Sequence, residues 1–490
     1  MKKLVERLHL PNWLTFILLI VFILRIPTFF EPFYYGDETI YLTLGEGIKQ
    51  GVPLYKGLHD NKPPLIYLIA ALAGNVFWFK VILAVSSFAG IILFWKLSRS
   101  FFGKNEKFQK VSTLVFSVLS TIPLFEGNIA NAEMFMITLS LAAIYVLWGR
   151  VYTPKNLLLS GVLFSLAALF KVPAAFELPA IIIYWLIITP TTKENLMKTG
   201  KNSFYLVAGF VVPIVATLVW YQVHGSLGEY ISAVYFQNAS YLSSWRPGDV
   251  ARPFIQRNLP LIIRSLVALA SFVVIFLSKK KLSKEFSFLS IWLVLALFAV
   301  TLSERPYPHY FLQALAPLSF FVGMLVSFRT YEQVLAIIPL TIAFFVPFYF
   351  HFWYYSTTSY YSRFLGFITG NITKEEYFAR FDKNVNRNYK IADFLAKSTR
   401  RKDRVFVWGD SSTIYALSRR LPPLKYVANY HLKDFSSPEE LIISLLTNKP
   451  KVIVILPEER LDASILTLAH KYYMLLSKIE GAEIWYIRSN

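Results

Sequence analysis

Cysteine is absent from this chain of 490 residues, and charged residues are scarce, at 16%. Without cysteine the chain has no disulfide framework and no cysteine-based metal or redox site. Hydrophobic residues make up 55% of the sequence and aromatic residues 17%, which is far from the composition of an average soluble globular protein. The composition therefore indicates an integral membrane protein.

Apolar runs long enough to cross a bilayer, about 17 to 25 residues, occur about eleven times in the sequence. The predicted spans are 13–30, 79–98, 109–125, 131–149, 156–170, 173–189, 203–223, 259–277, 286–302, 310–328 and 332–352. The apolar segment 64–76 is short and predicts an interfacial helix. The first run is too long, and too poor in small residues, for a removable signal peptide, so it predicts a membrane anchor.

Acidic residues are fewer than basic ones, 30 against 50, and the formal net charge is +20. The basic residues gather in alternate loops between the predicted spans, chiefly 96–110, 150–155, 191–202 and 278–284. This pattern predicts a cytoplasmic N-terminus and an extracytoplasmic C-terminal region, with attraction to anionic lipid headgroups. Because the basic residues are scattered and form no single stripe, nucleic acid is not an expected partner.

A soluble pattern begins near residue 380. Helical periods are predicted at 386–398, 411–418, 437–447 and 462–475, and strands at 404–408, 451–456 and 483–487. The first strand runs into WGDSS, residues 408–412, which lacks a Gly-rich phosphate fingerprint and therefore predicts no nucleotide site. The predicted fold is a polytopic α-helical membrane domain (1–352, with an outer loop at 31–78), a linker (353–379) and a small α/β domain (380–490).

Ionisable side chains collect on the predicted outer face, beside the membrane surface. Polar groups there must meet water, a partner or a bound polar substrate, so the outer face is the expected place for chemistry. Its candidate residues are Asp37, Glu38, His59, Asp60, Lys62, Glu133, Lys171, Arg246, Arg305, Tyr307 and His309.

Glycosyl transfer from a polyprenyl-phosphate-linked sugar fits this arrangement, because that donor has its tail in lipid and its phosphate at the interface. The acceptor hydroxyl needs a carboxylate as general base, for which Asp37 is the first candidate. The leaving phosphate needs cations and donors, which Lys62, Lys171, Arg305 and His309 can supply. Since the phosphate is a stabilised leaving group, direct displacement with inversion is sufficient, and a paired-carboxylate retaining mechanism is not required.

Five short motifs carry a family resemblance. They are GDETIY at 36–41, HDNKPPLIYL at 59–68, NAEMF at 131–135, FKVPA at 170–174 and RPYPHYFLQALAP at 305–317. Together they resemble the GT-C membrane glycosyltransferases of the dolichyl-phosphate-mannose protein mannosyltransferase type, including the bacterial lipid A aminoarabinose transferases. The likeness covers residues 13–330, and the soluble tail is similar to that of bacterial members. It implies a hexosyl- or pentosyltransferase in the plasma membrane of a prokaryote, with an acceptor outside the cytoplasm.

The resemblance also implies roles for single residues. Asp37 takes the place of the family's catalytic Asp, Glu38 completes its DE pair, and Lys62 takes the place of the donor-phosphate ligand ahead of PPL. Glu133 takes the second acidic position. In the aminoarabinose transferases a glutamate precedes the lysine, whereas this chain has Asn61, which weakens any carry-over of that sugar or of a metal site. No metal ligands are assigned, and a divalent metal stays open as a cofactor. The sequence assigns no acceptor, and His59, Asp60, Tyr307 and Arg246 are weaker candidates for substrate contacts.

Structural roles compete with these assignments. Asp37 and Glu38 could be a solvated start of a loop, and Glu133 a favourable charge at a helix N-terminus. Lys171 could be a snorkelling anchor at the membrane boundary, and His309 an ordinary interfacial side chain.

Two other functions remain open: a transporter or flippase of lipid-linked sugars, and a non-catalytic scaffold. The acids lie near one membrane face and not at the midplane, and the sequence contains no evident inverted repeat of broken helices, which favours an enzyme over a carrier. The gathering of charges on the outer face fits a scaffold least.

Overall fold

The computed structural model of the protein describes residues 10–239, 253–459 and 462–488. Arg246, a weak candidate for substrate binding, lies outside the described residues. The chain divides into two compact units. The helical unit comprises Met1–Ile26, Ile82–Tyr221 and Val234–Thr357, and the mixed unit comprises Pro27–Val81, Gln222–Ala233 and Thr358–Asn490.

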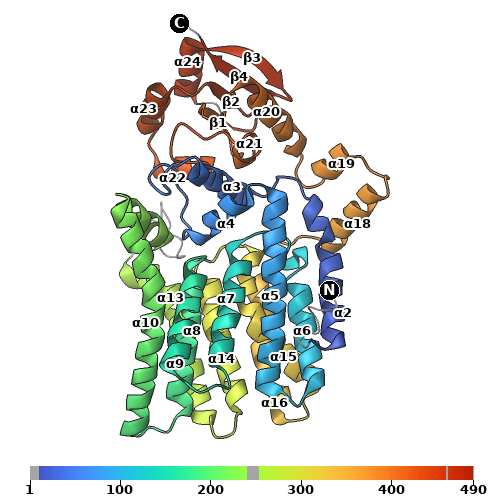
Figure 1. Cartoon of the computed structure of the whole chain (residues 1–490), viewed down its shortest axis with the longest axis vertical. Coiled ribbons are helices and arrows are strands. Elements are labelled where there is room, and N and C mark those ends of the chain that lie inside the picture. Colours follow the sequence, from blue (N-terminus) through green and yellow to red (C-terminus); the bar gives the residue numbers. More distant parts are fainter. Residues whose placement is uncertain (1–9, 240–252, 460–461, 489–490) are drawn as a thin grey trace. The chain divides into compact units, whose positions relative to one another are not determined.

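Every predicted span contains a helix, and the element labels are those of Figure 1. The elements are α2 (Asn12–Arg25) with η1 (Ile26–Phe30), α5 (Val76–Phe102), α6 (Glu106–Leu119), α7 (Ala132–Leu147), α8 (Pro154–Ala168), η3 (Val172–Phe176) with α9 (Glu177–Ile188), α10 (Lys193–Val223), α13 (Phe254–Ser278), α14 (Lys284–Thr301), η6 (Pro308–Phe311) with α15 (Leu312–Ser327), and α16 (Tyr331–Leu335) with α17 (Ile337–Tyr349).

Among the described residues, seven helical segments are long and apolar enough to cross a membrane. They are Asn12–Phe30, Val76–Phe102, Lys193–Val223, Phe254–Ser278, Lys284–Thr301, Pro308–Ser327 and Tyr331–Tyr349. Ala132–Leu147, Pro154–Ala168 and Val172–Ile188 are shorter apolar helices. The membrane-helical fold is therefore confirmed, whereas the number of eleven spans stays a prediction.

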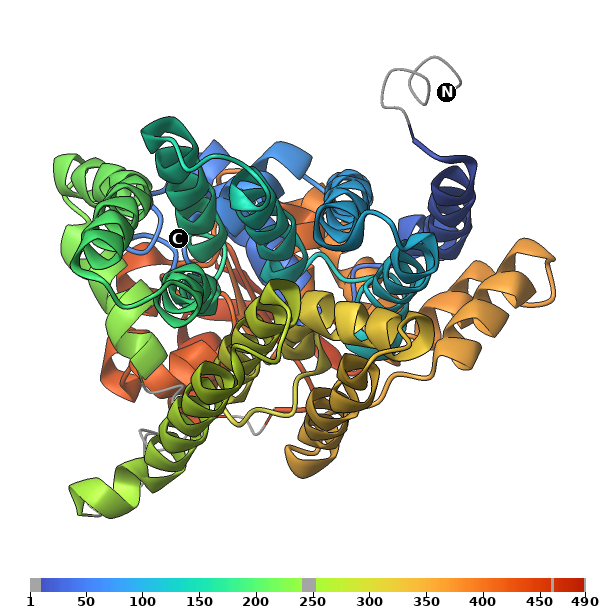
Figure 2. The same cartoon turned by 90° about the horizontal axis from the view of Figure 1, so that it is seen from below.

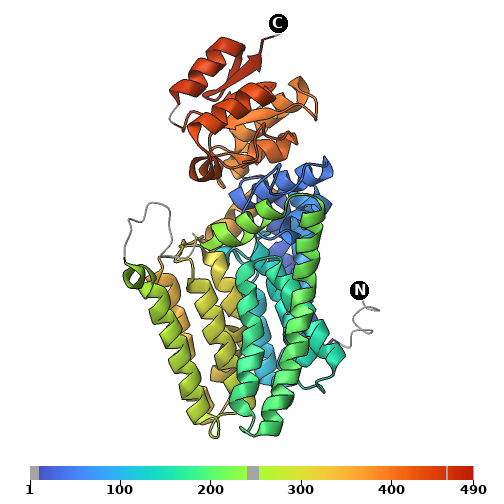
Figure 3. The same ribbon diagram turned by 90° about the vertical axis from the view of Figure 1, so that its left-hand side faces the viewer.

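Within the helical unit, α7 packs against α8, α6 against α15, and α14 against both α9 and α15. Figure 2 shows the helices of this unit from below, and Figure 3 shows α10 and α13 (green and yellow-green) as long rods. Polar side chains define several helix starts. The Thr153 hydroxyl accepts from the N–H of Asn156 at the start of α8, and the Ser283 hydroxyl accepts from the N–H of Phe286 at the start of α14.

In the mixed unit, the segment after the first span forms two helices, α3 (Gly36–Lys49) and α4 (Leu65–Ala73). Their contact is close, since a Cβ added to Gly45 would lie 2.5 Å from the backbone nitrogen of Ala71. The predicted interfacial helix at 64–76 thus appears as the short helix α4, which ends at Gly74 in the left-handed conformation (φ 71°). The helix α3 also packs against α21 (Ser412–Ser418) of the C-terminal domain.

The C-terminal domain has a four-stranded sheet with the order β1-β2-β4-β3. The strands are β1 (Val405–Trp408), β2 (Val452–Ile455), β3 (Tyr473–Ile479) and β4 (Ala482–Ile487). β1 and β2 are parallel, with Val405 opposite Val452, whereas β4 pairs antiparallel with both β2 and β3. The VFVW and VIVI runs of the parallel pair are buried throughout, as continuous apolar strands usually are.

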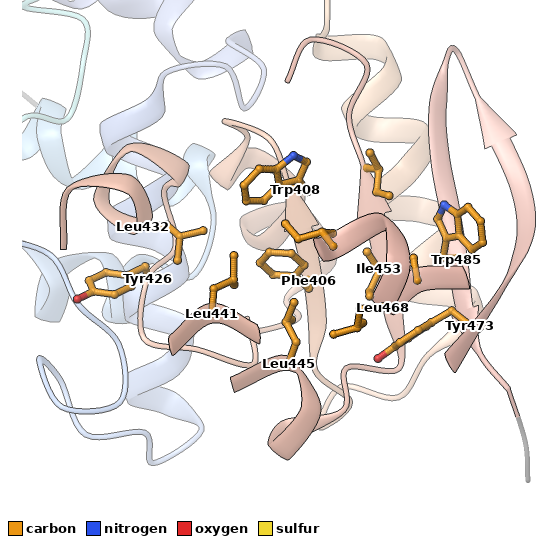
Figure 4. Packing of buried hydrophobic residues seen from close by; sticks show 13 residues of the cluster. Phe406, Trp408, Tyr426, Leu432, Leu441, Leu445, Ile453, Leu468, Tyr473 and Trp485 are labelled. Atoms are coloured by element: carbon orange, nitrogen blue, oxygen red, sulfur yellow. The ribbon is translucent and has the colours of Figure 1, made fainter. Parts of the chain in front are cut away.

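The helices of this domain are α20 (Val385–Ser398), α21, α22 (Asn429–Phe435), α23 (Pro438–Asn448) and α24 (Ala463–Tyr472). Figure 4 shows Phe406 and Ile453 of the sheet among side chains from these helices, including Leu432, Leu445 and Leu468. The α/β class predicted for the tail is thereby confirmed.

The prediction missed one strand and one helix of this domain. The segment 462–475 was predicted as one helix, but α24 ends at Tyr472 and β3 follows. The reason is the turn at Glu480 and Gly481, whose φ values of 47° and 84° suit a tight hairpin that pairs β3 with β4. Helix α22 was not predicted at all. Two helices, α18 (Thr357–Ile368) and α19 (Lys374–Ala379), lie in the segment predicted as a linker, and the domain boundaries stay a prediction.

Candidate functional site

Asp37 and Lys62 form an ion pair in the mixed unit. Asp37 lies in the first turn of α3, where the helix dipole favours a negative charge. The Lys62 Nζ lies 3.1 Å from Oδ2 of Asp37, and the Tyr41 hydroxyl donates to the same oxygen at 2.9 Å. The two side chains are 28% (Asp37) and 21% (Lys62) exposed, so the pair is half-buried and can still be reached by a ligand.

Two tyrosines fix the backbone of Lys62. The Tyr55 hydroxyl donates to the Lys62 carbonyl at 2.8 Å, and the Tyr67 hydroxyl accepts from the Lys62 N–H at 3.1 Å. Tyr67 in turn donates to Asp60 at 2.8 Å, and its burial beside this carboxylate holds the pKa of Tyr67 well above its usual value. Asp60 and Asn61 are themselves buried, and the Asn61 N–H donates to Asp60. Asp60 therefore supports the loop that carries Lys62.

Glu38, next to Asp37, lies in a different environment. Its Oε1 is 2.6 Å from Nζ of Lys80, which also lies 2.8 Å from Oε2 of Glu31. The Tyr360 hydroxyl donates to Glu31 at 2.5 Å, and all four side chains are buried. Of the predicted DE pair, Asp37 is the partner that solvent reaches. Lys80 was missed, although an ionisable residue inside a predicted span is by itself a signal.

A second polar cluster lies in the helical unit. Glu133, at the start of α7, forms an ion pair with Lys171, and Nε2 of His309 is 3.7 Å from the same carboxylate oxygen. The Lys171 Nζ also lies 3.5 Å above the Tyr310 ring, a cation–π contact. Nδ1 of His309 bonds to Glu126. The structure thus brings together three predicted residues, Glu133, Lys171 and His309, and adds Glu126.

Glu126 follows the short turn η2 (Pro123–Phe125) in the left-handed conformation, with φ 55°. The buried Arg25 supports this turn by donating to the Gly127 carbonyl at 3.1 Å and to the Ser87 hydroxyl at 2.9 Å. Tyr355 hydrogen-bonds to Glu126, and burial together with this carboxylate raises the pKa of Tyr355. Sequence reasoning placed Glu126 in an outer loop but gave it no role, because its partner His309 is far away in the sequence.

The remaining candidates occupy supporting positions. Tyr307 stacks on His309, with ring centroids 5.6 Å apart, and Arg305 lies just before it, with its N–H donating to the Ser303 hydroxyl. His59 is buried in the mixed unit, where its backbone N–H donates to the Lys425 carbonyl at 2.7 Å. Its ring lies 5.8 Å from that of His431 in α22.

A divalent metal was left open by the sequence. In the described ranges 10–239, 253–459 and 462–488, no three His, Asp or Glu side chains form a group suited to hold a metal ion. The Asp37 carboxylate is paired with a cation instead.

Comparison with known proteins bears on these clusters. Residues 61–221 match the family model for dolichyl-phosphate-mannose-protein mannosyltransferases, a range that holds Lys62, Glu133 and Lys171. Residues 385–483 match the model for the C-terminal domain of the putative competence-induced protein Ccs4. The structure resembles ArnT from Cupriavidus metallidurans bound to undecaprenyl phosphate, with 14% identity, 97% of this chain and 98% of that chain covered, and a TM-score of 0.59.

This protein has a GT-C-like fold, as ArnT does. The apo structure of the same ArnT is similar as well, at 14% identity, with 97% of each chain covered and a TM-score of 0.55. An uncharacterized protein of Aquifex aeolicus is 26% identical over 309 residues, which are 58% of this chain and 56% of that protein. This chain thus spans about half the length of that relative.

Proposed function

We propose that this protein transfers a sugar from a polyprenyl-phosphate donor to an extracytoplasmic acceptor, with inversion at the anomeric carbon. The half-buried Asp37–Lys62 pair is the observation that carries the proposal, because it sets a carboxylate and a cation side by side at the start of α3. The family match, which includes Lys62, and the undecaprenyl phosphate bound to the similar ArnT support a lipid-phosphate donor.

The reaction needs one base and one stabilised leaving group. The Asp37 carboxylate accepts the proton of the acceptor hydroxyl while that oxygen attacks the anomeric carbon. The bond between this carbon and the phosphate oxygen breaks, and the polyprenyl phosphate leaves with the electron pair. Lys62 stabilises the charge that develops on the phosphate oxygens.

Glu38 has a positioning role in this proposal. Its burial against Lys80 keeps it from the acceptor, and the ion pair fixes the first turn of α3 that carries Asp37. In the helical unit, the phosphate-binding roles of Lys171, Arg305 and His309 stay predictions, and Glu133 is paired with Lys171. We further propose a prokaryotic plasma membrane, a cytoplasmic N-terminus and an extracytoplasmic C-terminal domain, as the basic loops predict.

The decisive test supplies the purified protein with a panel of polyprenyl-phosphate sugars and measures released polyprenyl phosphate. Asp37→Asn should abolish release and leave the fold intact. Asp393→Asn is the matched control, because Asp393 pairs with Lys397 on an exposed face of α20. Full turnover in the Asp37 variant would remove that residue from its role. Movement of labelled donor across vesicles without phosphate release would favour a flippase instead.

A further inference from the structure

The C-terminal domain has a polar edge where its parallel strands end. The carboxyl ends of β1 and β2 lie at the same edge of the sheet, which is where open α/β sheets commonly bind ligands. Asp410 and Ser411 follow β1 there. The N–H of Asn429, the first residue of α22, donates to the Asp410 carboxylate, which places the start of α22 at this edge.

Three side chains near this edge carry buried polar atoms without a hydrogen-bond partner among the described residues. They are Ser411 (Oγ), Asn429 (both amide atoms) and His431 (Nδ1), and these residues are 7%, 5% and 2% exposed. Buried polar groups in native proteins nearly always have a partner, and an unpaired one costs stability. A partner outside the chain is therefore expected here.

This edge contacts both segments that carry the proposed catalytic pair. The Ser412 hydroxyl lies 2.7 Å from that of Thr39 and 3.3 Å from the carbonyl of Gly36, the residue before Asp37. Nε2 of His431 lies 3.7 Å from Asp60 in the loop of Lys62. Burial lowers the pKa of His431, and the charges of Asp60, Lys62, Asp37 and Asp434 also act on it. The edge thus lies within electrostatic range of the catalytic pair.

The charges of the edge select the class of ligand. Asp410 is exposed, and partial desolvation, and next the charge of Glu459, raise its pKa. An added anion at this edge would therefore meet two carboxylates. The nearby cation Lys433 already pairs with Glu459 at 2.9 Å. A phosphate is thus a poor fit. The amide, hydroxyl and imidazole groups with unpaired atoms instead include both donors and acceptors, which matches sugar hydroxyls.

We propose that Ser411, Asn429 and His431 form the acceptor subsite, which takes an uncharged, hydroxyl-rich saccharide and directs one of its hydroxyls toward Asp37. This assignment rests on the proposed glycosyl transfer. It gives the soluble domain a part in choosing the acceptor.

The test measures binding of methyl α-mannoside, methyl α-glucoside and methyl β-galactoside to the full-length protein in detergent by saturation-transfer NMR. Asn429→Leu removes both unpaired amide atoms and keeps the number and branching of the side-chain heavy atoms. Asn388→Leu is the matched control, because Asn388 is a buried asparagine in α20 that interacts with Arg387. At least one glycoside should bind the wild type and the control alike, and bind the Asn429 variant about ten-fold more weakly.

Thermal unfolding separates a ligand subsite from a structural role. Removing unpaired polar atoms should leave the Tm of Asn429→Leu unchanged or higher, whereas an asparagine that stabilises the fold through bound water would lower it. Equal glycoside binding by Asn429→Leu and wild type, or no binding of any glycoside to the wild type, overturns the subsite. A different outcome is that the wild type binds a glycoside but releases no polyprenyl phosphate from any donor. That outcome overturns the transferase proposal, and the bound saccharide is then not an acceptor. Saccharide binding at the edge is still supported.

Discussion

Replacement of Lys80 by methionine should destabilise the protein more than any surface charge deletion. Lys80 is 1% exposed and holds Glu31 and Glu38 at 2.8 and 2.6 Å. Methionine keeps most of the side-chain volume but leaves two buried carboxylates without their shared cation. Removal of one partner from a buried ion pair costs about 3 to 5 kcal/mol, a large part of the roughly 5 to 15 kcal/mol that stabilises a typical domain.

The matched control is Lys390→Met, because Lys390 pairs with Glu480 at 2.5 Å while 63% of its side chain is exposed. A surface pair of this kind contributes about 0 to 1 kcal/mol. Thermal unfolding in detergent should therefore show a large fall in Tm for Lys80→Met and little change for the control.

A triple variant tests the physical reason for this difference. Lys80→Met combined with Glu31→Gln and Glu38→Gln removes all three charges, so it should recover much of the loss caused by Lys80→Met alone. The reasoning is refuted if Lys80→Met unfolds at the temperature of the Lys390 control, or if the triple variant is no more stable than the single one.

Three further outcomes are expected. Lys62→Ala should weaken donor binding by about ten-fold or more, because a charge-assisted contact contributes about 1.5 to 3 kcal/mol. Isothermal titration with a polyprenyl-phosphate sugar measures the donor Kd. An unchanged Kd contradicts the assignment of Lys62 to the phosphate. His431 should make the fold sensitive to acid. Because burial lowers its folded pKa below the ordinary 6.5, the stability it contributes is complete above pH 6.5 and is lost as the pH falls through the folded pKa. The Tm of the wild type should therefore fall more between pH 7 and pH 5 than that of His431→Gln, and parallel curves would count against this explanation. Ser412→Ala removes hydrogen bonds to the start of α3, so it should lower kcat several-fold while the donor Kd stays constant. A normal kcat in a steady-state assay would show that these hydrogen bonds do not position Asp37.

The sequence predicts the fold well where the signal is local. Apolar runs locate a helix in every predicted span, and the VFVW and VIVI runs locate the two parallel strands. Prediction fails where neighbouring chain segments decide the outcome. The segment after Tyr472 keeps an apolar pattern that suits a helix, but pairing with β4 makes it a strand.

In the candidate site, too, the sequence predicts what depends on nearby residues and misses what depends on residues far away in the sequence. Asp37 and Lys62 were predicted from their residue types and their place near the membrane. They lie together because the helix α3 carries Asp37 and the loop that follows it carries Lys62. The partner of Glu38 could not be identified in this way, since most of α3 and all of α4 lie between Glu38 and Lys80 in the sequence. Asp37 and Glu38 are adjacent in the sequence, yet the first side chain is half-buried and the second is fully buried. A helix turns by about 100° per residue, so Asp37 remains half-exposed on one side of α3 while Glu38 points into the interior. A motif of two acids therefore specifies one candidate base and one structural anchor, and burial decides which is which.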